Sequence, residues 1–365
     1  MERVGGDPTA TNLDEVRRPM IEFPRQTRHS RGGLVLALGG GGARGLAHFG
    51  VFQAICEAGW EVQRIVGTSM GALAGAMLAS RPPKESPEQC AYRATTFLSS
   101  ERFCLQQQAL YGVAPGKEQP RQPGVLGWLD GIRHYLRSRS LCNRVLSEAS
   151  LLRDDVLVEA IEQLVPDIDI AEAETPLSVV AVDLRSGHQI VLERGSLRKA
   201  VQASMSIPGI FPPVAWDDML LCDFGVLESL PTEIAACYGE GLVVGVDVGP
   251  TLERAVDCES ALHVLLRMDE IGERLFRRHA LTHADLVIRP EVGRFEWWDF
   301  SHPQGMMQAG LEAARAALRQ LEDRPPLTTS SSPETYDPIC NKSGKWGGRL
   351  FGLLRGLSVP ARDSQ

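Results

Sequence analysis

Several features that would assign this chain to a well-known class are missing from its sequence. The eight cysteines are scattered singly and form no CxxC pair, so the sequence predicts neither a zinc ribbon nor a thioredoxin-type site. Unpatterned cysteines in a chain of 365 residues predict a reduced, intracellular protein. Residues 1–31 lack the apolar core of a secretory signal, and no apolar run is long enough to span a bilayer. We therefore expect a cytoplasmic protein that meets lipid, if at all, peripherally at the inner membrane face.

A surplus of basic residues is also absent. Lysine and arginine number 38 against 46 aspartates and glutamates, which gives a net charge of −8. A protein that binds nucleic acid needs a dense basic surface to neutralise phosphates, so nucleic acid is not expected as a partner. The share of hydrophobic residues, 43%, is that of an ordinary globular protein with enough apolar mass for a core.

Apolar runs and glycine-rich turns alternate along the chain. Residues 34–38 form a short continuous apolar run, typical of a strand buried on both faces, and four glycines and a helical pattern follow it. Residues 65–78 repeat this order of strand, glycine turn and helix. Further strands are expected at 177–182, 189–192, 243–248 and 286–288, and further helices at 155–165, 196–205, 261–278 and 306–321. The alternation predicts an α/β fold with a mostly parallel sheet covered on both faces.

The composition divides the chain into one domain and two tails. Residues 1–32 are expected to form a disordered tail, residues 33–321 a single domain, and residues 322–365, rich in Pro, Ser, Thr and Gly, a flexible tail. Within the domain, the proline-rich stretch 80–127 predicts an insertion or lid that is partly helical around residues 88–98.

The C-terminal tail contains a short basic amphipathic pattern. Trp346, Leu350, Leu353, Leu354 and Leu357 fall at helical spacing among lysines and arginines. Such a segment can lie in a membrane interface, or it can pack its aromatic side chains onto the domain. Four glycines in the same stretch each cost about 1 kcal/mol of helix stability, which weakens the first interpretation.

The first glycine turn has the spacing G-x-G-x-x-G at Gly40, Gly42 and Gly45. Dinucleotide-binding proteins share this spacing, but their second strand ends in an acidic residue, whereas here it ends in Gly67-Thr68-Ser69. A Walker A motif is excluded because no Gly-Lys-Ser/Thr follows the glycines. Backbone N–H groups at a helix N-terminus suit an oxyanion as well as a phosphate, so the loop is a candidate oxyanion hole.

The second glycine turn contains a candidate nucleophile. Residues 67–71 read Gly-Thr-Ser-Met-Gly, the G-x-S-x-G pattern, between a short strand and an Ala-rich helix. Gly67 and Gly71 allow the sharp turn that projects Ser69 above the edge of the sheet. Ser69 is also expected to cap the helix that follows.

A serine nucleophile needs a group that accepts its proton, and the sequence offers two kinds. His263, His279 and His283 lie in or beside a charged helical stretch and are better explained as solvated or core residues, which leaves His302 as the histidine to test. Asp223 follows an apolar pair at an expected strand end, where α/β enzymes keep their chemistry. Taken alone, Asp223 is better explained as a turn or capping residue.

Three stretches in combination resemble the patatin-like phospholipases: residues 39–45, residues 67–71, and the block 203–213 that precedes Asp223-Phe224-Gly225. The similarity covers residues 34–236. It implies a three-layer α/β/α sandwich and a Ser–Asp dyad in which Ser69 is the nucleophile and Asp223 the base. By the same resemblance, Gly40, Gly41, Gly42 and Arg44 would build the oxyanion hole, no metal or other cofactor is needed, and phospholipids, lysophospholipids or other fatty-acyl esters are the expected substrates.

One position departs from the family pattern, which has glycine directly after the aspartate. This chain has Phe224 there. If the position requires a positive φ, phenylalanine would be strained by about 1–2 kcal/mol, or its ring could line the acyl pocket. Two alternatives to the dyad therefore stay open: a Ser–His–Asp esterase or thioesterase that uses His302, and a catalytically weakened scaffold that binds lipid or protein.

Overall fold

A computed structural model of the chain describes residues 33–100, 103, 150, 154–225, 229–250 and 261–322. The expected tails at 1–32 and beyond residue 322, with the basic amphipathic segment, lie outside the described residues. Most of the stretch 101–149 also lies outside the described residues. The described strands are β1 (Leu34–Leu38), β2 (Val62–Thr68), β3 (Leu177–Asp183), β4 (Gln189–Leu192), β5 (Val214–Trp216), β6 (Met219–Cys222), β7 (Leu242–Val246) and β8 (Leu286–Ile288).

The strands form one sheet in the order β5-β6-β3-β2-β1-β7-β8, with β4 paired to β3. The central run from β3 to β8 is parallel, and β4, β5 and β6 join it through antiparallel pairings, β4 and β6 on opposite edges of β3 and β5 on β6. The mostly parallel sheet predicted from the sequence is therefore confirmed. Its parallel part places the carboxyl ends of β1, β2 and β7 at the same edge, where loops can gather functional side chains.

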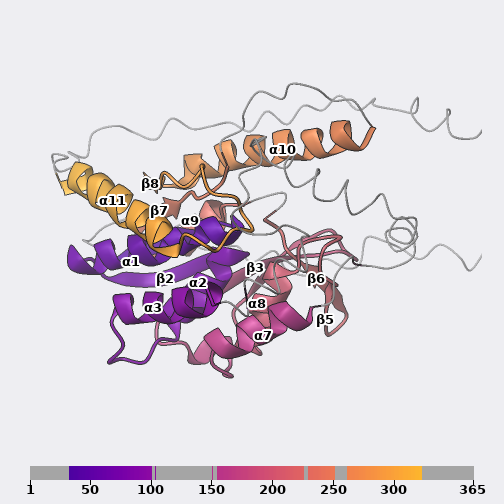
Figure 1. The fold of residues 1–365 in the computed structure, drawn as a ribbon, viewed down its shortest axis with the longest axis horizontal. Helices are drawn as coiled ribbons and strands as arrows, with labels where there is room; N and C mark the ends of the chain where they lie inside the picture. The colour runs from indigo at the N-terminus through magenta and orange to yellow at the C-terminus, as the bar shows by residue number, and fades with distance from the viewer. Residues whose placement is uncertain are drawn as a thin grey trace, which may run out of the picture. The chain divides into compact units, whose positions relative to one another are not determined.

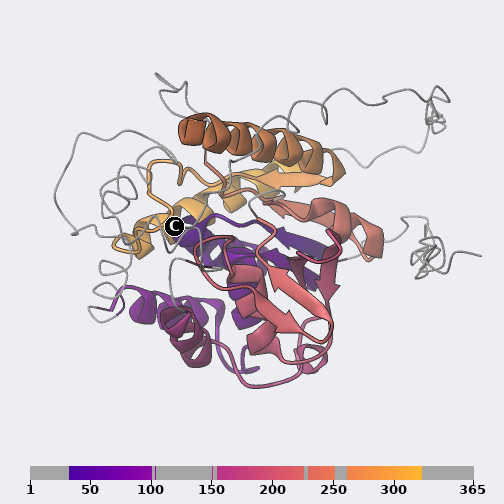
Figure 2. The ribbon, with the colours of Figure 1, turned by 90° about the vertical axis from the view of Figure 1, so that its right-hand side faces the viewer.

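Helices cover both faces of this sheet, as Figures 1 and 2 show. Alternate residues of β1 point to opposite faces: Leu36 joins the larger apolar core and Val35 the smaller one. The larger core includes buried side chains of α1 (Ala47–Glu57), α2 (Met70–Ala79), α3 (Pro87–Leu98), α7 (Asp155–Leu164), α8 (Leu197–Met205) and α11 (Pro303–Glu322). The smaller core lies under α9 (Thr232–Tyr238), which the end of α10 (Ala261–Ala280) contacts through a Thr232–Ala280 hydrogen bond. The architecture is the expected three-layer α/β/α sandwich.

The start of the predicted insertion belongs to the body of the domain. Residues 87–98 form α3, which begins with a capping box of Ser86 and Gln89 and has Pro87 in its first turn. Cys90, Ala94 and Leu98 are buried in the larger core. Pro87 therefore marks the N-terminus of a helix that packs on the core.

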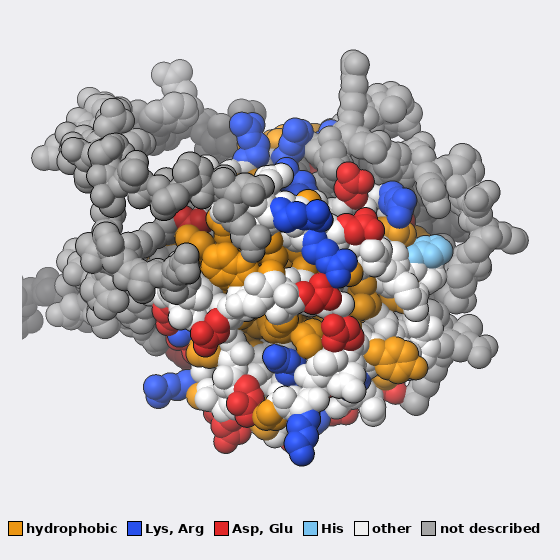
Figure 3. All heavy atoms as spheres, turned by 90° about the vertical axis from the view of Figure 1, so that its left-hand side faces the viewer, with side chains coloured by type: hydrophobic (Ala, Val, Ile, Leu, Met, Phe, Trp, Pro, Cys, Tyr) orange, Lys and Arg blue, Asp and Glu red, His pale blue; other side chains and the backbone are white. Residues whose placement is uncertain are grey.

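The surface shown in Figure 3 mixes charges of both signs around apolar side chains. Among the helices that the structure describes, none combines the length and the apolar character needed to cross a bilayer.

Candidate active site

Ser69 occupies the sharp turn between β2 and α2. Its backbone has φ 55° and ψ −124°, a conformation that L-residues rarely adopt, and Asp217 is the only other non-glycine residue with positive φ in the described part of the chain. A Cβ on Gly71 would lie 2.1 Å from the carbonyl oxygen of Leu38, so the turn needs glycine there because it packs against the end of β1. The predicted strained turn is present. Ser69 occupies the predicted N-cap position of α2, where its carbonyl accepts from the N–H groups of Ala72 and Leu73, but its side chain makes no capping hydrogen bond.

Strand pairing explains how the two ends of the candidate dyad meet. Thr68, the last residue of β2, pairs with Val180 of β3, and Cys222, the last residue of β6, pairs with Val182. Strand β4 also pairs with Val180 and Val182, so it must occupy the other edge of β3. β2 and β6 therefore share one edge of β3. Because β2 is parallel and β6 antiparallel to β3, the two strands end facing each other.

This arrangement places Ser69 and Asp223, which directly follow β2 and β6, beside each other. A Cβ on Gly225 would lie 2.9 Å from Asp223 Oδ1 and 3.5 Å from Ser69 Cβ, so one glycine borders both side chains. The Ser69 hydroxyl lies close enough to the Asp223 carboxylate to lower the pKa of Asp223. The structure thus brings together two residues that the sequence placed in separate motifs.

The C-terminal end of α8 holds the backbone of both residues. The Ser69 N–H donates to Ser204 Oγ at 2.9 Å, and the Ser204 hydroxyl donates in turn to the carbonyl of Val180 at 2.6 Å. The Asp223 N–H donates to the carbonyl of Ser206 at 2.9 Å. Ser204 and Ser206 are therefore positioning residues. The sequence flagged their block, 203–213, only by resemblance and gave no sign of this role.

Asp223 is buried without a cation. Its side chain is 3% exposed, and no ion pair involves it among the described residues. Desolvation raises the pKa of Asp223 to about 6, while the Ser69 side chain and the Gly225 N–H, which donates to Oδ1 at 2.7 Å, favour the charged form and lower it. A carboxyl group with this pKa is ionised near neutral pH and is a better base than an ordinary aspartate.

Phe224 does not disturb this site. It is absent from the described non-glycine residues with positive φ, so the strain considered for this position does not arise. Its half-buried ring packs against the smaller core, on the face of the sheet opposite to α2 and α8, and it does not line the cavity beside Ser69. The backbone N–H of Gly225, the next residue, donates a hydrogen bond to Asp223 Oδ1.

The glycine loop after β1 lies against Ser69, and its amides differ in availability. A Cβ on Gly40 would lie 3.1 Å from Ser69 Cβ, so the loop borders the nucleophile. The Gly40 N–H donates to the carbonyl of Ser229 at 2.7 Å and is therefore not free for an oxyanion, contrary to the expectation. The N–H groups of Gly41 and Gly42 have no hydrogen-bond partner among the described residues, and Gly42 lines the cavity.

His48 and Arg44 are buried beside the loop. His48 Nε2 lies 2.8 Å from the carbonyl oxygen of Gly39, and burial lowers the pKa of His48 to about 4. The imidazole is therefore neutral, and because a carbonyl can only accept, Nε2 is the protonated nitrogen that donates to the loop. Arg44 is 7% exposed, and the charges acting on it are those of Glu296, Arg277 and Glu273. Its side chain does not line the cavity, so a direct role in the oxyanion hole is not supported.

A buried network of charges supports the far side of the loop. The Ser229 hydroxyl, whose backbone carbonyl accepts from Gly40, donates to Glu273 of α10. Arg277 contacts Glu273 at 3.5 Å and Asp247 at 3.4 Å, and Asp247 also pairs with Arg289 at 3.0 Å. Burial raises the pKa of Glu273. The sequence did not indicate this network, because its members come from separate elements and form no motif.

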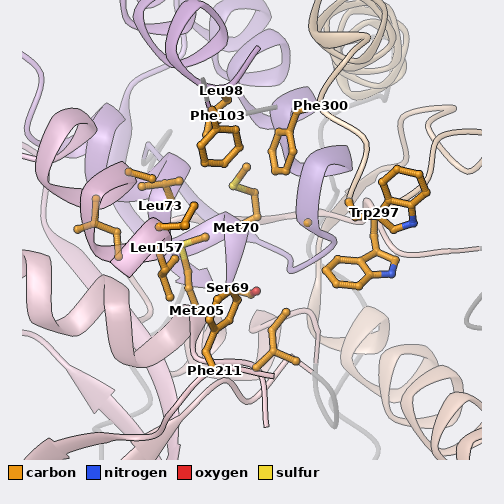
Figure 4. A pocket seen from close by; sticks show the side chains of 16 residues that line it. Ser69, Met70, Leu73, Leu98, Phe103, Leu157, Met205, Phe211, Trp297 and Phe300 are labelled. Carbon is orange, nitrogen blue, oxygen red and sulfur yellow. The ribbon is translucent and has the colours of Figure 1, made fainter. Parts of the chain in front are cut away.

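An apolar cavity opens beside Ser69, whose hydroxyl oxygen is seen among carbon side chains in Figure 4. The cavity encloses about 80 Å³, well above the roughly 10–15 Å³ that one water molecule requires, so it can admit part of an organic molecule. Its walls come from α2, α7, the end of α8 and the 297–300 loop. The lining residues are Gly42, Ser69, Met70, Leu73, Leu98, Phe103, Val156, Leu157, Ala160, Ile161, Met205, Ile207, Phe211, Trp297, Trp298 and Phe300.

His302 lies outside this constellation. It is exposed at the surface, and its ring contacts Phe295 at a centroid distance of 5.9 Å. It does not line the cavity, although Trp297, Trp298 and Phe300 of the same loop do. The geometry therefore favours Asp223 over His302 as the partner of Ser69.

The chain is similar to known proteins over most of its length. The sequence profile of the patatin-like phospholipases matches residues 36–236. An uncharacterized NTE family protein of Mycobacterium tuberculosis is 29% identical over 315 residues, which cover 80% of this chain and 47% of that protein. Patatin-like phospholipase domain-containing protein 7 of Mus musculus is 28% identical over 325 residues, or 81% of this chain and 21% of that protein.

The chain thus spans about half the length of the mycobacterial relative. Among solved structures, VipD from Legionella pneumophila aligns with a TM-score of 0.42 and 18% identity, over 81% of this chain and 67% of VipD. The profile match alone covers more than half of the 365 residues. The protein belongs to the patatin-like phospholipase family.

Proposed function

We propose that this protein hydrolyses carboxylic esters of lipids, with Ser69 as nucleophile and Asp223 as general base. The observation that carries the proposal is the meeting of β2 and β6 on one edge of β3. This pairing sets a strained serine beside a buried carboxyl group, at the wall of an apolar cavity. Strained backbone, raised pKa and apolar cavity together are typical of an acyl-transfer site.

The first half of the reaction forms an acyl-enzyme. Asp223 accepts the hydroxyl proton while Ser69 Oγ attacks the ester carbonyl carbon, and the carbonyl oxygen becomes an oxyanion. The N–H groups of Gly41 and Gly42 are the candidate donors to this oxyanion. They follow Gly40, which borders Ser69, they have no partner among the described residues, and Gly42 lines the same cavity as Ser69. The intermediate then expels the alcohol, which receives the proton from Asp223.

The second half reverses these proton transfers with water in place of the alcohol. Asp223 takes a proton from water as its oxygen attacks the acyl carbon, and collapse of the second oxyanion returns the proton to Ser69. The products are a fatty acid and an enzyme with both residues in their starting states. Each step keeps the charge within the buried site, where fixed N–H donors stabilise it more strongly than bulk water would.

The cavity indicates the substrate class. Aliphatic, aromatic and methionine side chains make up most of its wall, which suits the hydrocarbon chain of a fatty-acyl ester and offers little to a polar acyl group. Met70 and Met205 stand close to Ser69 in Figure 4, and flexible methionine side chains can adapt to a bound chain. Phospholipids and lysophospholipids are the proposed substrates, reached by peripheral contact with a lipid surface.

A fluorophosphonate probe tests the proposal, because it labels only an activated serine. Purified protein should be labelled at Ser69 and should hydrolyse a medium-chain p-nitrophenyl ester. Ser69→Ala should lose labelling and several orders of magnitude of turnover, with a thermal unfolding midpoint close to that of the unchanged protein. Turnover above a tenth of the original in Ser69→Ala would refute the assignment.

The two alternatives have less support. A histidine triad would need His302, which is exposed and outside the cavity. The argument for a weakened, non-catalytic scaffold rested on Phe224, and the structure places that ring away from the site without strain.

A further inference from the structure

Two histidines and a glutamate gather on the surface far from the cavity in the fold. Glu233 lies in the first turn of α9, His279 in the last turn of α10, and His283 in the short 3-10 helix η3 (Leu281–His283). α9 covers the smaller core, on the face of the sheet opposite to α2 and the nucleophile. None of the three residues takes part in the proposed reaction.

The donor atoms are close enough to share one metal ion. One carboxylate oxygen of Glu233 and one ring nitrogen each of His279 and His283 all lie within 4.8 Å of one another. Ligands at 2.0–2.2 Å from a tetrahedral zinc ion stand roughly 3.3–3.6 Å apart, so small side-chain rotations would complete the site. Two imidazoles and one carboxylate suit Zn²⁺, whereas Mg²⁺ and Ca²⁺ prefer oxygen ligands throughout.

The backbone already holds the three residues in place. His279 and His283 are four residues apart across the α10–η3 junction, and their rings stand 5.2 Å apart at 85°. The Thr232 hydroxyl, next to Glu233, donates to the carbonyl of Ala280, which joins the start of α9 to the end of α10. A metal ion would find its ligands on elements that are already joined, so little ordering would be needed on binding.

One ring nitrogen in the cluster lacks a partner. His283 is half-buried, and its Nδ1 is buried without a hydrogen bond among the described residues. A buried polar atom without a partner is uncommon and costs free energy. Rotation of the ring toward a shared cation would give this nitrogen a bond that the protein alone does not supply.

We propose that Glu233, His279 and His283 bind one zinc ion, with water at the fourth position, and that this ion ties α9 to the end of α10. The site is peripheral and structural, because no residue of the catalytic constellation touches it. The histidines were considered from the sequence only as candidate bases, and their spacing alone gave no sign of Glu233, which precedes them by more than forty positions.

Zinc binding by the untagged, metal-stripped full chain tests the site. All proteins should carry Cys237→Ser, because the exposed thiol of Cys237 lies one helical turn from Glu233 and could bind zinc by itself. Competition with a chromogenic chelator should show one zinc ion per chain, bound at least tenfold more weakly in His279→Ala, His283→Ala and Glu233→Gln. His302→Ala, which removes another exposed histidine, should bind zinc as tightly as the background protein.

Cobalt substitution and thermal unfolding complete the test. Cobalt should give the absorption of a four-coordinate N/O site without a thiolate band, and zinc should raise the unfolding midpoint of the background protein but not that of His279→Ala. His279 is exposed, so its removal should leave the fold intact. Equal zinc affinity in His279→Ala and His302→Ala, a thiolate band, or no zinc binding would each overturn the proposal.

Discussion

Two buried aspartates stand directly after strands of the same sheet and have opposite surroundings. Asp247 follows β7, is 5% exposed, and is paired with Arg277 and Arg289. Asp223 follows β6, is 3% exposed, accepts a hydrogen bond from the Gly225 N–H, and forms no ion pair with any residue that the structure describes. Burial depth is nearly the same, so the difference in partners decides what each carboxyl group can do. The paired aspartate fixes loops around α10, and the unpaired one keeps a proton affinity suited to general base catalysis.

The comparison also shows what a buried carboxyl group costs. A buried ion pair offsets much of the desolvation of each partner, whereas a lone buried carboxylate is stabilised only by hydrogen bonds. Removing the negative charge should therefore lower the free energy of unfolding at Asp247 and raise it at Asp223.

Asp223→Asn should remove most of the activity. The amide keeps the shape of the side chain but cannot accept a proton as a carboxylate does, so turnover of a p-nitrophenyl ester should fall by about 10²–10⁴-fold. The folded protein should persist, because the Gly225 N–H can still donate to the side-chain oxygen. Steady-state kinetics and circular dichroism measure the two quantities. An active Asp223→Asn protein would remove Asp223 from the mechanism.

Asp247→Asn should have the converse effect. It leaves Arg277 buried with only Glu273 as an acidic partner, which should lower the free energy of unfolding by about 3 kcal/mol. Turnover per folded molecule should change little, since Asp247 does not line the cavity. Urea unfolding measures the loss of stability, and active-site titration gives the turnover per folded molecule. A fully stable but inactive Asp247→Asn protein would reverse the roles assigned to the two aspartates.

The charge on Asp223 should make stability fall with pH. Its pKa is about 6 in the folded chain and about 3.9 when unfolded, so between these values the native state binds more protons than the unfolded state. The free energy of unfolding should therefore decrease by about 3 kcal/mol from this group as pH rises from about 4 to 6. Asp223→Asn should lack this component and be relatively more stable at pH 8. Identical pH profiles for the two proteins would contradict the raised pKa.

His48 should affect turnover through the glycine loop. Gln can place an amide N–H near the position of Nε2 and hold the Gly39 carbonyl, whereas Phe cannot. We expect His48→Phe to lower kcat by about tenfold with a smaller change in KM, and His48→Gln to recover part of that loss. Equal kcat in His48→Gln and His48→Phe, at equal stability, would show that the hydrogen bond to Gly39 has no positioning role.

His302→Ala should have the smallest effect. The side chain is exposed and its ring lies against that of Phe295, outside the cavity, so kcat/KM should stay within about twofold. A loss of kcat/KM comparable to that of Asp223→Asn would support the Ser–His–Asp triad with His302 as the base.

Local patterns were sufficient to predict the first strand and the sharp turn at Ser69. The apolar run at Leu34–Leu38 and the glycines around Ser69 each depend on neighbours within a few residues, and both were found where they were expected. The roles of Ser204 and Asp247 were not predictable, because each depends on strand register and on partners from distant elements. The expected roles of Gly40 and Phe224 were wrong for the same reason. A hydrogen bond to Ser229 occupies the Gly40 N–H, and Phe224 lies on the other face of the sheet, and neither fact is visible in a single sequence.

The most direct test of the account is the pH dependence of fluorophosphonate labelling at Ser69. The rate should rise with pH through a single inflection near 6, the pKa of the buried carboxyl group, because only ionised Asp223 can accept the serine proton. His302→Ala should leave this inflection in place, and Asp223→Asn should abolish both it and most of the labelling. An inflection that survives in Asp223→Asn, or one that disappears in His302→Ala, would contradict the assignment of Asp223 as the base.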